Sequence, residues 1–193
     1  MKKLFLIILL LVQGQVFAQK WQELNNQGRQ LRKEKKYKEA IVALEKAKSE
    51  VEKKSGKMSK NYAIVVNNLA LVYDDMNNFN LAEPLYREAL SIYKSTTGEK
   101  DVVYITTLEN LGYLYQQQGK FKEAEEFYGQ ALAINKEVLW TKHPDYATSL
   151  ENLAKLAEKS GQKDKAEKLY IEHLNLIKDN LGEKNPTYAT AME

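Results

Sequence analysis

The sequence predicts an all-α solenoid of paired antiparallel helices, and a repeat of 42 residues is the main reason. Tyrosines recur at this spacing, and small residues recur at two further positions of the same register. These positions are Tyr62, Tyr104, Tyr146 and Tyr188; Ala40, Ala82, Ala124 and Ala166; and Gly28, Ala70, Gly112 and Ala154. A fixed period of roughly 20–50 residues is typical of solenoids, in which each repeat buries its apolar face by stacking on the next.

Each repeat reads as two helices joined by a short turn. In the second repeat, apolar residues at helical spacing predict a first helix over about 62–76 and a second over about 79–95. One register position between the two helices favours residues that accept the left-handed backbone conformation. It holds Lys35, Asn77, Gly119 and Gly161 in the four repeats, while Gly56, Gly98 and Gly182 mark the junctions between repeats.

The repeat boundaries follow from this register. The predicted segments are a signal peptide at 1–18, a degenerate first repeat at 19–60, further repeats at 61–102, 103–144 and 145–186, and the start of a fifth at 187–193. In the first repeat, Gln27 stands where the other three have leucine. A degenerate, polar first repeat is suited to cap the N-terminal end of a solenoid.

Residues 1–18 have the three parts of a secretory signal peptide. Lys2 and Lys3 precede the apolar run Leu4 to Val12, and small residues at Val16 and Ala18 predict cleavage after Ala18. The alternative is an uncleaved membrane anchor, but the run is far shorter than the roughly 20 residues that span a bilayer. We therefore expect a periplasmic or secreted protein without stable membrane insertion after cleavage. A lipoprotein is excluded because the chain has no cysteine.

Composition excludes several functions. With no cysteine, the chain has no disulfide, thiol nucleophile or cysteine-based zinc site. Cleavage would leave 27 basic and 26 acidic residues, a balance that does not favour nucleic-acid binding. The charge is uneven, with a net +7 over residues 20–60 and −6 over 61–193. The basic end is interpreted as a solvated face, the alternative being contact with an acidic ligand or a membrane surface.

The small–aromatic–small pattern of the paired helices resembles the tetratricopeptide repeat. The kinesin-light-chain subtype of this repeat, with its 42-residue period, is similar to three segments of the chain: Asn-Leu-Ala-Leu-Val-Tyr at 68–73, Ala-Glu-Pro-Leu-Tyr-Arg-Glu-Ala-Leu at 82–90 and His-Pro-Asp-Tyr-Ala-Thr-Ser-Leu at 143–150. The short apolar run and Lys2-Lys3 start of the signal peptide indicate a bacterial exported member. The resemblance implies a right-handed superhelix whose first helices line a concave surface that binds a protein or peptide. The Lys/Asn clamp of chaperone-binding members is not reproduced.

One set of polar residues points to a binding surface. Asn26, Asn68, Asn110 and Asn152 stand 42 residues apart, on the face that the resemblance places in the concave groove. An asparagine amide both donates and accepts hydrogen bonds, so this ladder can hold a peptide backbone; equally, each asparagine can bond to a neighbouring helix and set the repeat spacing. Neighbouring register positions would add selectivity. They are Arg29, Leu71, Tyr113 and Lys155, and Asn25, Asn67, Glu109 and Glu151. This mixed chemistry favours an extended peptide over nucleic acid.

No residue pattern predicts an enzyme, a metal site or a cofactor. The two histidines, His143 and His173, have no metal-ligand or triad partner at a recognisable spacing, and His173 is expected to be a partly packed substitution. Two functions remain. One is an exported scaffold that binds a protein or peptide. The other is the sensing arm of a longer protein, since 187–193 is too short to cap the array and related bacterial arrays precede caspase-like protease or sensor kinase domains.

Overall fold

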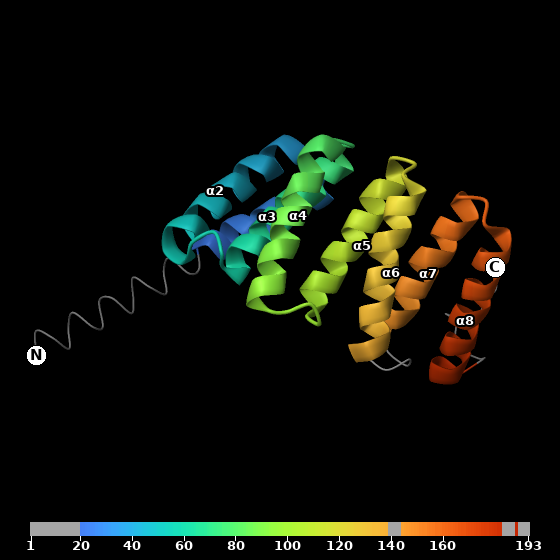
Figure 1. The fold of residues 1–193 in the computed structure, drawn as a ribbon. Coiled ribbons are helices and arrows are strands. Elements are labelled where there is room, and N and C mark those ends of the chain that lie inside the picture. Colours follow the sequence, from blue (N-terminus) through green and yellow to red (C-terminus); the bar gives the residue numbers. More distant parts are fainter. Residues whose placement is uncertain (1–19, 139–143, 183–187, 189–193) are drawn as a thin grey trace, which may run out of the picture. The chain divides into compact units, whose positions relative to one another are not determined.

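The computed structural model describes residues 20–138, 144–182 and 188, and the regular elements within these ranges are helices (Figure 1). A helix over residues 20–33 comes first. The others are α2 (Tyr37–Ser55), α3 (Lys60–Asp75), α4 (Phe79–Thr96), α5 (Val102–Gln117), α6 (Phe121–Val138), α7 (Pro144–Lys159) and α8 (Lys163–Leu181). The all-α solenoid prediction is confirmed, and α3 and α4 match the predicted bounds closely. The predicted signal peptide and His143 lie outside the described residues.

The chain divides into an N-terminal half, residues 1–96, and a C-terminal half, residues 97–193. In the N-terminal half α3 packs on both α2 and α4, and in the C-terminal half α5, α6, α7 and α8 pack in chain order. The second helix α6 therefore contacts both the first helix of its own repeat, α5, and the first helix of the next, α7, just as α3 contacts the second helices before and after it. This is the stacking by which a solenoid buries its apolar faces.

The turns within the repeats share one geometry. Lys35, Asn77, Gly119 and Gly161 all have positive φ, of 59°, 55°, 71° and 78°. The next residue donates its N–H to a carbonyl five residues back, which ties down the last turn of the first helix. These bonds are Lys36 N to Leu31 O, Asn78 N to Tyr73 O, Lys120 N to Tyr115 O and Gln162 N to Ala157 O, at 2.8–2.9 Å. The predicted turn register is confirmed in every repeat, including the first, where a lysine accepts a strained conformation.

Small residues permit close packing between the two helices of a repeat. A Cβ added to Gly112 would lie 2.7 Å from a ring carbon of Tyr128, and one added to Gly28 would lie 2.5 Å from Leu44. On the second helices, Ala82 and Ala124 are fully buried. The helices meet through these residues, with no room for a larger side chain.

The repeated tyrosines link the two helices of one repeat. The rings of Tyr62, Tyr104 and Tyr146 are buried. The Tyr146 hydroxyl donates to Glu172 Oε1 at 2.8 Å, and Tyr62 has the corresponding hydrogen bond to Glu88. Burial, reinforced by these carboxylates, raises the pKa of both tyrosines to about 12. At Tyr62 and Tyr146, this register position therefore holds a buried ring whose hydroxyl bonds to a carboxylate on the partner helix.

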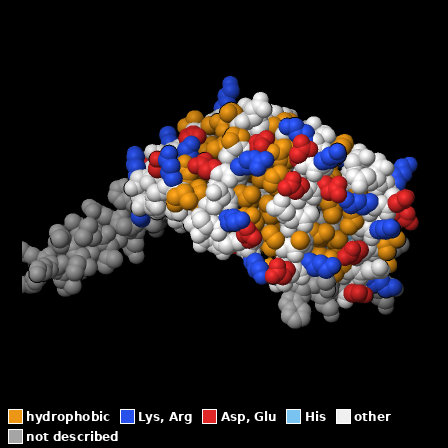
Figure 2. Space-filling view, in the orientation of Figure 1, with side chains coloured by type: hydrophobic (Ala, Val, Ile, Leu, Met, Phe, Trp, Pro, Cys, Tyr) orange, Lys and Arg blue, Asp and Glu red, His pale blue; other side chains and the backbone are white. Residues whose placement is uncertain are grey.

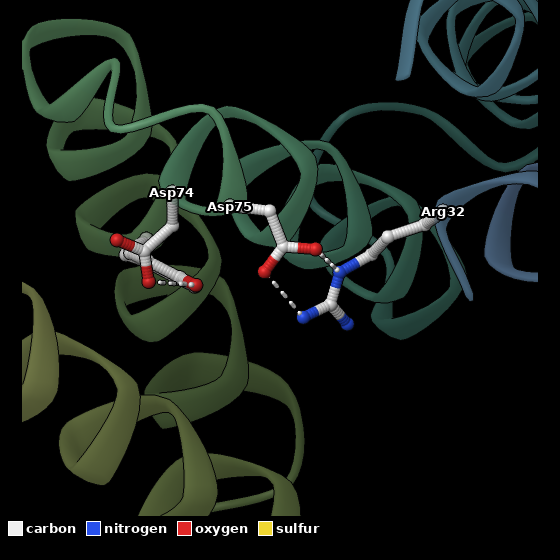
Figure 3. Close-up of polar contacts among 4 residues, drawn as sticks. Arg32, Asp74 and Asp75 are labelled. Carbon is white, nitrogen blue, oxygen red and sulfur yellow. Dashed lines mark hydrogen bonds and ion pairs between the residues drawn. The ribbon is translucent and has the colours of Figure 1, made fainter. Parts of the chain in front are cut away.

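A second polar cluster lies at the end of α3, where two adjacent carboxylates have different surroundings (Figure 3). Asp75 accepts two hydrogen bonds from Arg32 of the preceding repeat, one from Nε at 2.7 Å and one from Nη2 at 3.0 Å. Asp74 is buried and accepts only the Tyr86 hydroxyl, at 3.4 Å. Its Oδ1 has no partner among the described residues. Burial raises the pKa of Asp74 to about 6; the Tyr86 hydrogen bond and Arg32 oppose the rise, and Asp75 adds to it.

Replacing Ala124 with Trp should destabilise the C-terminal half by at least about 1–3 kcal/mol, because the indole must force α6 away from its neighbours. Chemical unfolding monitored by circular dichroism measures the change. Ala133→Trp is the matched control, because Ala133 is an exposed alanine on the same helix and should tolerate the substitution. Equal stability of the two variants would contradict the packing described for α6.

Replacing Asp74 with Asn should stabilise the protein at pH 7.5 and leave its stability nearly unchanged at pH 4. The folded-state pKa, about 6, lies above the ordinary value of 3.8 for an aspartate side chain. The native state therefore binds the proton more tightly, and wild-type stability falls as pH rises from about 4 through 6. A shift of this size corresponds to about 1–3 kcal/mol in the free energy of unfolding.

Urea unfolding at pH 4 and pH 7.5 tests this pH dependence. Asp75→Asn is the control: it disrupts the Arg32 fork and should give no gain at pH 7.5. If Asp74→Asn raises the free energy of unfolding equally at pH 4 and pH 7.5, the charge of Asp74 is not what destabilises the wild-type protein.

Candidate functional site

The predicted asparagine ladder lies on a solvent-accessible face of the first helices. We call this the ladder face and define it by Asn26, Asn68, Asn110 and Asn152 together with Arg29, Leu71, Tyr113 and Lys155. None of these side chains is buried. Asn26, Arg29, Tyr113 and Lys155 are exposed, and the other four are half-buried. Each half thus carries two repeats of the ladder face, on residues 20–33 and α3 in the N-terminal half and on α5 and α7 in the C-terminal half.

In the N-terminal half the ladder has a structural contact. Asn68 Nδ2 donates to Asn25 Oδ1 at 2.7 Å, from α3 to the preceding first helix. Asn25 is only 5% exposed, which corrects its prediction as a groove-lining residue: its amide is used between helices. Asn68 therefore makes a contact between adjacent repeats, as the second of the two roles that the sequence left open would require.

In the C-terminal half the ladder has unused hydrogen-bonding capacity. Asn110 and Asn152 have no hydrogen-bond partner among the residues that the structure describes, and both are half-buried. Tyr113, one turn beyond Asn110, is 48% exposed. An amide and an aromatic ring that face solvent on one helix can take up a ligand backbone and an adjoining side chain. The same register position thus has a hydrogen-bond partner at Asn68 and none, among the described residues, at Asn110 and Asn152.

A buried polar network lies behind the ladder face of α5 and α7. Ser149 Oγ donates to Glu109 Oε1 at 2.6 Å, and Asn135 Nδ2 donates to Ser149 Oγ at 2.9 Å and to the Asp145 carbonyl at 3.3 Å. Asn135 and Ser149 are almost fully buried. Sequence reasoning missed this network. The available signal was Asn135 itself, which occupies a register position held by Val51, Tyr93 and Ile177 in the other repeats.

Glu109 is the charged end of this network. Its side chain is half-buried, and burial raises the pKa of its carboxyl; the Ser149 hydrogen bond opposes the rise, and the nearby Asp145 charge adds to it. Glu109 forms no ion pair within the described part of the chain. Glu151, its equivalent in the next repeat, is paired with Lys155 on the same helix at 2.5 Å. Glu151 therefore already has a cationic partner, and we leave it out of the candidate site.

The remaining chemistry-bearing residues do not form a site. His173 is 9% exposed on α8, and burial lowers its pKa, as expected for a partly packed histidine. Within the described ranges, no group of His, Asp and Glu side chains could hold a metal ion. The helices in those ranges are also too short or too polar to cross a membrane.

Comparison with solved structures shows the same fold in several proteins. BtubC (BKLC) from P. vanneervenii has a TM-score of 0.75 and 23% identity, over 84% of this chain and 65% of its own length. A Podosopora anserina protein of kinesin-light-chain type with nearly identical TPR-like repeats has a TM-score of 0.78 and 20% identity, over 88% of this chain and 81% of its own. Pseudomonas aeruginosa pilF has a TM-score of 0.64 and 20% identity, over 91% and 67%. This chain therefore spans about two thirds of the length of BtubC and of pilF.

No curated protein matches the sequence. The tetratricopeptide repeat family model matches residues 23–95 and 103–179, which is most of the chain and most of the helices described above. The match agrees with the turn geometry, the small residues at helix contacts and the helix pairing within each half. The chain belongs to the tetratricopeptide repeat family.

Proposed function

We propose that the protein is an exported interaction scaffold that binds a protein or an extended peptide along its ladder face. The supporting observation is that Asn110 on α5 and Asn152 on α7 have no hydrogen-bond partner among the described residues, and that the ring of Tyr113, one turn from Asn110, is exposed. Tetratricopeptide repeats generally mediate protein–protein interaction and are generally not enzymes. We extend both properties to this chain and assign it no catalytic role.

The chemistry of the surface favours a polypeptide partner over nucleic acid. Figure 2 shows acidic and basic side chains interspersed with hydrophobic ones on the face drawn, rather than a continuous basic surface. Nucleic-acid-binding surfaces concentrate lysine and arginine on one face or stripe. Asparagine amides suit a peptide backbone, which offers a donor and an acceptor at each residue.

We further propose that the protein is of the kinesin-light-chain subtype. The 42-residue register supports this, because it accounts for the turns, the buried tyrosines and the close helix contacts described above. The Podosopora anserina protein of similar fold also carries kinesin-light-chain repeats.

A second candidate function is recognition within a longer protein that continues the array and carries a caspase-like protease or sensor kinase domain. One observation favours it, a groove of about 790 Å³ beside α8 whose lining includes Ile171, Leu174 and Tyr188. Leu132, the equivalent of Leu174 one repeat earlier, packs against the core of Tyr146, Leu150 and Leu176. Leu174 therefore lies on a surface that, one repeat earlier, is covered by the next helix pair. Sequencing the gene beyond Glu193 would test this candidate.

Export predicts a mature N-terminus at Gln19. The basis is the positive start, the apolar run and the small residues Val16 and Ala18. Expression in a Gram-negative host, fractionation and N-terminal sequencing measure the result. Ala18→Arg should block cleavage and leave the precursor in the membrane fraction. Intact Met1 on the wild-type protein would contradict export by this route.

Asparagine substitutions separate ligand binding from structural roles. Asn110→Ala and Asn152→Ala should weaken peptide binding with little change in melting temperature, each lost hydrogen bond contributing about 0.5–1.5 kcal/mol. Asn68→Ala should instead destabilise the protein by about 1–3 kcal/mol, because it leaves buried Asn25 without its partner.

These three substitutions occupy one register position, so each serves as a control for the others. Binding to peptides selected from a random displayed library, and thermal unfolding, are measured on the same preparations. Unchanged affinity in the Asn110→Ala, Asn152→Ala double variant would remove the ladder from the proposed function.

A further inference from the structure

We propose that the C-terminal half recognises an arginine side chain of the ligand bound at its ladder face, with Glu109, next to Asn110 of that face, as the ion-pair partner and Tyr113 as the stacking surface. The inference rests on the proposed function and specifies the partner: an extended segment that carries an arginine. Both residues lie on α5, four positions apart, so they share one face of that helix.

Glu109 lacks a positive partner within the described residues. Its Oε1 is held by Ser149, and its side chain is half-buried, yet no lysine or arginine pairs with it in the described ranges. Asp145 adds further negative charge nearby. A carboxylate partly removed from water is unfavourable unless a cation and hydrogen bonds compensate it. A ligand cation would provide that compensation.

Tyr113 makes arginine the best fit among cations. Its ring is 48% exposed, one helical turn from Glu109. A guanidinium is flat, so it can stack on an aromatic ring while its N–H groups donate to a carboxylate. Ser149 occupies only Oε1 of Glu109, so Oε2 can accept from the ligand. The adjacent Asn110 amide is positioned to hold the ligand backbone beside the arginine.

The wider charge of this half favours the same ligand. Residues 97–193 contain 12 lysines, no arginine and 16 acidic residues, a formal net charge of −4. A net negative surface attracts a cationic segment and repels an acidic one. Glu151 supplies a comparison, because it occupies the same register position as Glu109 but already pairs with Lys155.

The test begins with a random 12-residue peptide library displayed on phage and selected on the purified protein. Arginine should be enriched at one position of the bound peptides. One selected peptide and its Arg→Gln version are then titrated by fluorescence anisotropy against wild type, Glu109→Gln, Tyr113→Ala and Glu151→Gln. With wild type, the Arg→Gln peptide should bind about tenfold more weakly or worse.

Glu109→Gln should weaken binding of the arginine peptide by a similar factor and abolish the difference between the two peptides. It keeps an acceptor for Ser149, and circular dichroism checks that it is folded. Tyr113→Ala removes an exposed ring and should reduce the arginine preference several-fold without loss of stability. Glu151→Gln should preserve the preference, because its charge is already paired.

The outcomes distinguish this inference from the function beneath it. Selected peptides that bind wild type but lack arginine, or an arginine preference that survives Glu109→Gln, would overturn the inference and leave the peptide-binding function standing. If no peptide is enriched on wild type over a variant with Asn110, Asn152 and Tyr113 all changed to Ala, both proposals fail.

Discussion

A helix pair of this protein cannot bury its apolar face alone, and that constraint organises the structure. The two helices of a repeat must first approach closely, which they do through positions such as Gly112 against the Tyr128 ring. Their joint face must then meet the next pair, as Leu132 of α6 meets the core of Tyr146 and Leu150 on α7. Turn geometry, buried tyrosines and small residues all recur at one period because each repeat faces the same packing problem.

The candidate site follows from the same constraint. Stacking buries part of each first helix and leaves the ladder face accessible to solvent. Asn68 is drawn into the contact between repeats through Asn25, whereas Asn110 and Asn152 are not. A repeated residue can thus support the scaffold in one repeat and present an unused amide in another, and only the identity of its neighbours decides which.

Most of the fold could be predicted from the sequence because periodicity reports directly on backbone geometry. Lys35 shows the strength of the register: its position predicted a turn, and the turn is present although lysine is a poor residue for it. The site was less predictable. Spacing placed Asn25 beside the groove, but its burial depends on a side-chain contact with Asn68 that spacing does not encode. The Glu109–Ser149–Asn135 network was missed for the same reason, since it depends on side-chain contacts between three helices.

Some polar contacts join the two helices of one repeat, and others join adjacent repeats. This difference determines how the helix pairs can unfold locally. Tyr146 to Glu172 joins two helices of one repeat, while Arg32 to Asp75 and Ser149 to Glu109 cross to the neighbouring repeat. No described polar link within either half reaches beyond that neighbour. A terminal helix pair can therefore fray while the pairs behind it stay folded, and the cost of fraying is limited to a single interface. In such an array amide hydrogens exchange fastest at the ends, and a ligand that bridges α5 and α7 also acts as a clamp on the seam between two repeats.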